Sequence, residues 1–123
     1  MSATKLTDVG LTFMSRMTQL QELYLAETAI TDSSMTLLKR YTQIKLLDLN
    51  QTRITDLGVV ELADMRNLET LMLSGKGITD AAFPMLVGLK KLQKLFLTKT
   101  KLSRLAVQQL KRKLPKCEVI FAK

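Results

Sequence analysis

The chain has 123 residues, of which 46% are hydrophobic and 24% are charged, and its formal net charge is +8. This length accommodates one domain, and the apolar content is too high for a disordered chain. The sequence has no histidine and a single cysteine, Cys117, which excludes His-dependent catalytic triads and an intramolecular disulfide. The first residues lack a secretory signal pattern, and no apolar run reaches the ~20 residues that span a bilayer. We therefore expect a soluble, cytoplasmic protein with no membrane insertion.

Self-similarity at a fixed offset of 24 residues organises the chain. Four segments superpose at this offset: LQELYLAETAITD (20–32), IKLLDLNQTRITD (44–56), LETLMLSGKGITD (68–80) and LQKLFLTKTKLSR (92–104). Such a period is typical of a protein whose units stack on one another. We predict one domain over 1–123, with an N-terminal capping helix at 1–19, repeats at 20–43, 44–67, 68–91 and 92–115, and a C-terminal capping strand at 116–123.

Each repeat begins with an L-x-L pattern, which alternates as a strand does, and continues through a turn into a helix. In the helical part the apolar residues lie three apart, as Met35, Leu38 and Tyr41 do in the first repeat, which gives one stripe of a short helix. One repeat cannot bury these residues alone, so the strands should align into a parallel sheet with the helices behind it. The predicted fold class is an α/β solenoid of about five units.

A Thr-Asp pair precedes the predicted helices, as in Thr31-Asp32. Either residue can accept hydrogen bonds from first-turn amides, and a carboxylate there favours the helix dipole. Pro84 is easier to place if Asp80 is the cap. We interpret the Asp column as helix caps, because one carboxylate per repeat cannot supply the six to eight oxygens of a calcium site. No metal site and no cofactor is predicted.

The repeat resembles the leucine-rich repeat family, whose L-x-x-L-x-L-x-x-N/C-x-L signature is met here with Thr in place of Asn or Cys. It is most similar to the short 24-residue class with a T-x-[I/L]-T-D segment, found mainly in bacterial repeat proteins, and LPKCEVIF (114–121) resembles a terminal segment of that class. The resemblance covers nearly the whole chain and departs from the pattern at Lys76 and Arg104. It implies a right-handed solenoid with a parallel β-sheet on its concave face and short helices on its convex face.

The residue between the two leucines of L-x-L points to the open side of the sheet. This column is mostly large and apolar, and an exposed apolar stripe with a polar rim is typical of a protein-binding surface. We predict a non-catalytic protein–protein interaction module that binds a protein or peptide on the concave face, through Tyr24, Leu46, Asp48, Met72, Lys94, Phe96 and Ile120. The alternative interpretation is that these residues merely suit strands or lie under a neighbouring segment.

Basic residues gather in the last part of the chain. Residues 76–123 hold 12 basic and 2 acidic side chains, against 7 and 9 in residues 1–75. An alternative function is therefore binding of nucleic acid or another anionic surface, through Lys90, Lys91, Lys111, Arg112 and Lys113. The competing interpretation is a set of solvated lysines that keep the solenoid soluble. Self-association through the ends or through the concave face is also compatible with the pattern.

Two further features invite a chemical interpretation that the sequence does not favour. Cys117 has no partner for a metal site, so we predict that it fills space in the core. The segment 74–77, Ser-Gly-Lys-Gly, lacks phosphate-loop spacing and stands where the other repeats have their turn. No nucleophile with an orienting partner can be assembled from the concave column, so we predict that the chain is not an enzyme.

Overall fold

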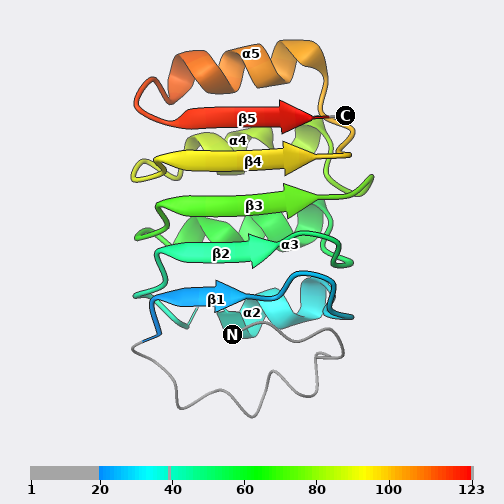
Figure 1. The fold of residues 1–123 in the computed structure, drawn as a ribbon, viewed down its shortest axis with the longest axis vertical. Coiled ribbons are helices and arrows are strands. Elements are labelled where there is room, and N and C mark those ends of the chain that lie inside the picture. Colours follow the sequence, from blue (N-terminus) through cyan, green and yellow to red (C-terminus); the bar gives the residue numbers. More distant parts are fainter. Residues whose placement is uncertain (1–19, 39, 123) are drawn as a thin grey trace.

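A computed structural model describes residues 20–38 and 40–122 of the chain (Figure 1). One parallel sheet runs through this part in the order β1-β2-β3-β4-β5. The strands are β1 (Glu22–Tyr24), β2 (Leu46–Leu49), β3 (Thr70–Ser74), β4 (Lys94–Thr98) and β5 (Glu118–Ala122). Consecutive strands are neighbours, and the helical segments lie behind the sheet (Figure 1). The predicted α/β solenoid of about five units is confirmed, while the capping helix expected at 1–19 lies outside the described residues.

Short helical segments connect the strands. They are η1 (Asp32–Ser34), α2 (Met35–Leu38), α3 (Asp56–Glu61), η2 (Leu62–Asp64), η3 (Asp80–Ala82), α4 (Phe83–Val87) and α5 (Arg104–Lys113). Each crossover brings the chain back to begin the next strand beside the previous one, as parallel pairing requires. In the described part α5 is the longest helix, and it lies at the same end of the stack as β5 (Figure 1).

The core consists of columns of like residues spaced 24 apart. In the register of the sheet Leu47 pairs with Leu71, and Leu71 pairs with Leu95, and all three are fully buried. The helical segments add their own buried columns, such as Leu38, Leu62, Leu86 and Leu110. Burying one such side chain contributes about 1.5–3 kcal/mol, so the stacking of repeats supplies the apolar burial that one repeat lacks.

Threonine, and not aspartate, is the residue that caps these helical segments. The hydroxyl of Thr55 accepts a hydrogen bond from the amide of Leu57 at 3.3 Å, and Thr79 does the same for Ala81 at 3.2 Å. In the last repeat Ser103 accepts from the amide of Ala106 at 3.1 Å. Pro84 does not require an aspartate cap, because η3 precedes α4 and Pro84 lies in the first turn of α4.

The aspartates instead connect one repeat to the next, which corrects their interpretation as helix caps. Each carboxylate binds a residue 23 positions later, at the start of the following helical segment. We call this series the aspartate ladder, and its pairs are Asp32 with Thr55, Asp56 with Thr79, and Asp80 with Ser103. Arg104 stands where the next aspartate would be. A guanidinium donates but does not accept hydrogen bonds, so Arg104 cannot continue the ladder.

The turn that follows each of β1, β2, β3 and β4 adopts a left-handed backbone at the same position of the repeat. Glu27, Gln51 and Lys99 have φ angles of 59°, 56° and 53°, and Gly75 has 115°. Gly75 therefore belongs to a turn, as its place in the repeat predicts. Only glycine adopts positive φ without steric cost, so the other three turns depend on the stacked repeats to hold them.

Candidate functional site

The residues between the strand leucines form one continuous row across the sheet. In the register Tyr24 pairs with Asp48, Asp48 with Met72, Met72 with Phe96, and Phe96 with Ile120. Adjacent strands of a sheet lie about 4.8 Å apart, so these side chains are direct neighbours. The first four are half-buried, and Ile120 is 36% exposed. Each of these side chains therefore keeps an accessible part.

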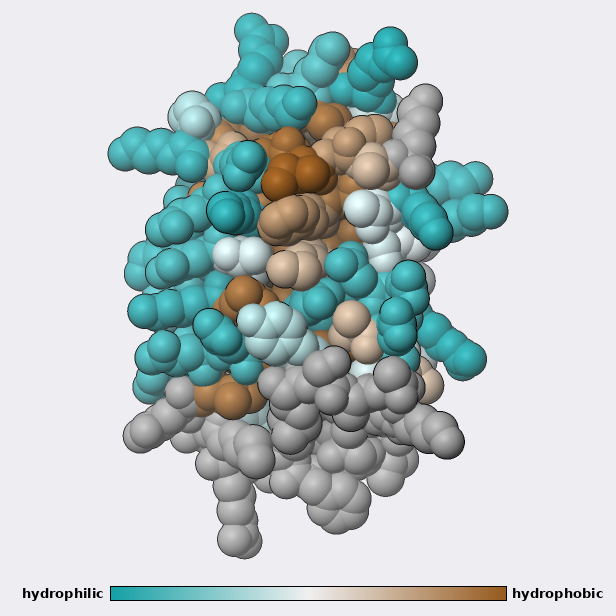
Figure 2. All heavy atoms as spheres, viewed as in Figure 1, coloured by the Kyte–Doolittle hydropathy of each residue, from teal (hydrophilic) through white to brown (hydrophobic). Residues whose placement is uncertain are grey.

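The apolar part of this row lies over the second half of the sheet. Met72, Phe96 and Ile120 come from β3, β4 and β5 in turn. Figure 2 shows a hydrophobic band over these strands, bordered on its left by hydrophilic side chains and on its right by residues of nearly neutral hydropathy. Accessible apolar side chains at neighbouring positions of three strands form a surface that loses unfavourable hydration when another molecule covers it.

The first half of the row is acidic. The Tyr24 hydroxyl donates a hydrogen bond to Oε1 of Glu22 at 3.3 Å. The pKa of the Tyr24 phenol is raised by partial burial first, and then by the negative charges of Glu22 and Asp48. Oδ1 of Asp48 also accepts a hydrogen bond from the amide of Asn50 at 3.0 Å, which fixes the direction of that carboxylate. A cationic group would therefore be favoured at this end of the sheet.

The remaining predicted binding residues lie in the column that flanks the row. Leu46 pairs in register with Thr70, and Thr70 pairs with Lys94, so Leu46 and Lys94 occupy the same column of the same face. Leu46 is half-buried and Lys94 is exposed. The structure thus brings all seven predicted residues onto one side of the sheet. We refer to them below as the sheet face.

The opposite flanking column is less open than the alternation predicts. Ser74 is buried, because its hydroxyl accepts a hydrogen bond from the amide of Gln51 at 2.7 Å and so closes the turn of the previous repeat. Asn50 is half-buried, and its Oδ1 has no hydrogen-bond partner among the described residues. The burial of these two polar side chains could not be predicted from the sequence, because neither residue type recurs at its position in the other repeats.

The fold is similar to that of two solved internalins from Listeria monocytogenes str. 4b F2365. For the internalin InlF the TM-score is 0.65 and the sequence identity is 19%, over 99% of this chain and 40% of that one. The chain adopts the leucine-rich repeat fold. For internalin C2 the TM-score is 0.53 and the identity is 22%, over 98% of this chain and 70% of that one. This leucine-rich repeat chain thus spans less than half the length of InlF. Neither a protein-family model nor a curated protein matches the sequence.

The basic residues predicted as an anion-binding group do not meet at one place on the leucine-rich repeat domain. Lys90 and Lys113 line a small cavity of about 170 Å³ together with Lys116. Lys111 lines a different cavity, between α5 and β5. The ammonium group of Lys91 donates to Oδ1 of Asn67 at 2.9 Å. The predicted set therefore does not line a single cavity.

Cys117 lines the same small cavity as Lys90 but is itself buried. Burial raises the pKa of its thiol, and the nearby Glu118 carboxylate raises it further. A raised pKa reduces the thiolate fraction at neutral pH, which fits a packing role.

Within residues 20–38 and 40–122, no three His, Cys, Asp or Glu side chains are grouped as metal ligands would be. No helix in the same ranges is long and apolar enough to cross a bilayer.

Proposed function

We propose that this leucine-rich repeat domain is a non-catalytic interaction module that binds a protein or peptide on the concave side of its sheet. The observation that carries the proposal is that Met72, Phe96 and Ile120 are neighbours in register on three adjacent strands and are each partly accessible. Aromatic and methionine side chains are favoured as anchors of protein interfaces. We keep the cytoplasm as the proposed location, because a lone thiol suits a reducing compartment.

The charge pattern of the sheet face supports a particular kind of segment. Apolar side chains of the partner would cover Met72 and Phe96, and a lysine or arginine would meet the carboxylates of Glu22 and Asp48. Burial of apolar surface contributes roughly 25 cal/mol per Å², whereas the carboxylates mainly fix the orientation of the partner. We therefore propose an extended partner segment that has apolar residues at one end and a cation at the other.

The test replaces Tyr24, Met72 and Phe96 together with Ser and compares the proteins captured from the native cell extract. The matched control replaces Leu57 and Leu105 with Ser, because these helix residues are 75% and 65% exposed and lie outside the sheet. We expect the sheet variant to lose specific partners that the control keeps, while both retain the circular dichroism of the original protein. Recovery of the same partners by a folded sheet variant would remove the sheet face as the binding site.

A second candidate function is binding of an anionic surface, and the meeting of Lys90, Lys113 and Lys116 at one cavity favours it. It predicts that affinity for DNA or anionic vesicles falls steeply with salt and is lost when Lys90, Lys113 and Lys116 are changed to Glu. A complex insensitive to salt would reject this candidate.

A further inference from the structure

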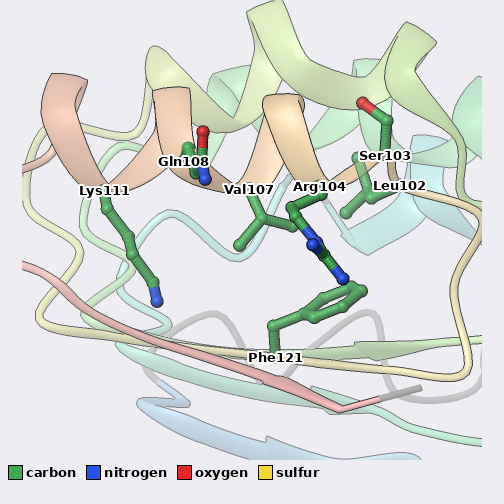
Figure 3. A pocket seen from close by; sticks show the side chains of 7 residues that line it. All are labelled: Leu102, Ser103, Arg104, Val107, Gln108, Lys111 and Phe121. Carbon is green, nitrogen blue, oxygen red and sulfur yellow. The ribbon is translucent and has the colours of Figure 1, made fainter.

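A cavity of about 640 Å³ opens between α5 and β5, at the end of the repeat stack. Figure 3 shows Arg104, Val107 and Lys111 pointing from α5 toward β5, while the ring of Phe121 points from β5 back toward α5. The volume lies within the roughly 300–1,000 Å³ that small-molecule sites occupy. We call this space the end cavity.

The floor of the end cavity is the apolar core itself. Phe121 pairs in register with Leu97 and so continues a column of inward-facing strand residues. Leu97 is fully buried, whereas Phe121 remains partly exposed because it faces the cavity. Leu102 and Val107 also line the space, and each is 6% exposed. A ligand entering here would contact the ring of Phe121 and the small accessible parts of Leu102 and Val107, and its apolar atoms would gain from leaving water.

The walls of the end cavity carry only positive charge. Arg104 and Lys111 are seven residues apart in α5, which is about 10.5 Å along a helix, and both side chains extend toward β5 (Figure 3). No aspartate or glutamate lines the space. An adjoining cavity of about 360 Å³ shares Leu102 and Phe121 with it and adds lysines at positions 76, 99 and 101. The local potential therefore favours an anion.

Arg104 is the residue that distinguishes this repeat from the three before it. The positions 24, 48 and 72 residues earlier are aspartates of the ladder. A cation in the first turn of a helix is opposed by the helix dipole, so Arg104 replaces a favourable charge with an unfavourable one. An anion bound to its guanidinium would offset that cost, and a guanidinium binds a carboxylate through two parallel hydrogen bonds.

We propose that the end cavity binds an amphipathic organic anion, a carboxylate with an apolar body. The carboxylate lies on Arg104, with Lys111 as the second cation, and the apolar body lies between Val107 and Phe121. None of these residues belongs to the sheet face, so this inference does not depend on the proposed protein-binding function.

The test uses decanoate as the probe and the full chain as the protein. Isothermal titration should show saturable binding of one decanoate per chain. Decanamide, which has the same apolar chain without the charge, should bind at least about tenfold more weakly. The double variant Arg104→Gln and Lys111→Gln should also weaken decanoate binding at least about tenfold, whereas Arg66→Gln should leave it unchanged. Arg66 is the matched control because it is an exposed arginine that does not line the cavity.

Three results would overturn the proposal. The first is absence of saturable decanoate binding, and the second is equal binding of decanoate and decanamide, a comparison that needs no variant to fold. The third is a concentration-dependent dimer that Phe121→Glu converts to monomer, because the cavity would then be an interface with a second copy of the chain. The variant with Ser at positions 24, 72 and 96 should still bind decanoate, so failure of the sheet-face proposal is separable from failure of this one.

Discussion

The carboxylate of Asp56 accepts hydrogen bonds from both the amide and the hydroxyl of Thr79, the residue that begins the helical segment of the following repeat. The amide of Thr79 lies 2.8 Å from Oδ1, and its hydroxyl donates to Oδ2. Asp32 and Thr55 repeat this arrangement one unit earlier, with an amide distance of 2.7 Å. Each aspartate thus stabilises the contact between two repeats, while the threonine it binds also caps a helical segment.

A double-mutant cycle on Asp56→Ala and Thr79→Ala tests this arrangement. Each single change should lower the free energy of unfolding by about 1–3 kcal/mol, because the remaining partner loses a charge-assisted hydrogen bond. The two effects should couple by roughly 0.5–3 kcal/mol, measured by urea denaturation. Thr79→Ser keeps the hydroxyl and serves as the control. Strictly additive effects would show that the two side chains act independently.

Two threonines at equivalent positions should respond differently to the loss of their hydroxyls. The hydroxyl of Thr52 donates to the carbonyl of Leu49 at 2.8 Å. The hydroxyl of Thr100 is buried and has no partner within the described part of the chain. Thr52→Val should therefore cost about 1 kcal/mol, while Thr100→Val should be neutral or stabilising, because it removes an unsatisfied polar group. Equal losses of stability in chemical denaturation would contradict this difference.

Alanine substitutions at two neighbouring residues of β3 should differ in their effect on stability, because one residue is in the core and the other is on the surface. Leu71 is fully buried, whereas Met72 is half-buried on the sheet face. Leu71→Ala should lower the free energy of unfolding by about 2–5 kcal/mol, since it leaves a cavity in the core. Met72→Ala should cost clearly less, because its side chain already contacts solvent. A larger loss for Met72 than for Leu71 in thermal or urea unfolding would place Met72 inside the core.

The thiol of Cys117 should react slowly with iodoacetamide at neutral pH. Burial, and then the charge of Glu118, raises its pKa above the ordinary value, so less of the reactive thiolate is present at pH 7. Its alkylation rate should rise with pH toward a midpoint above that of a free thiol, which titrates near pH 8.5. N-acetylcysteine in the same buffers gives the reference profile. A midpoint below that of the free thiol would mean that the group is activated.

The fold was predictable because one number, the 24-residue period, determines which side chains stack. The alternation of L-x-L then determines that Leu71 points inward and Met72 outward. The role of the aspartates was not predictable in the same way, because a Thr-Asp pair before a helix fits capping by either residue. Only the three-dimensional approach of Asp56 to Thr79 distinguishes the two roles. One feature of the sequence that bears on the role of the aspartates was that their column changes to arginine at Arg104.

The candidate sites differ in how far the sequence could reveal them. The row from Tyr24 to Ile120 follows from strand alternation alone, so its members could be named in advance. The burial of Ser74 depends on a turn in the previous repeat, which no pattern within its own repeat reports. The end cavity depends on the space between α5 and β5, and local periodicity contains no information about the distance between two elements.

The aspartate ladder also bears on how such a chain can change its length. Because every link joins equivalent positions, a tandem copy of residues 56–79 inserted between existing units would find both a carboxylate before it and a hydroxyl after it. A copy one residue shorter or longer would break the 24-residue spacing of the ladder unless a loop of the copy absorbed the change. Arg104 cannot supply the carboxylate of a further link, because a guanidinium does not accept hydrogen bonds. Internal duplication is thus compatible with the present contacts between repeats.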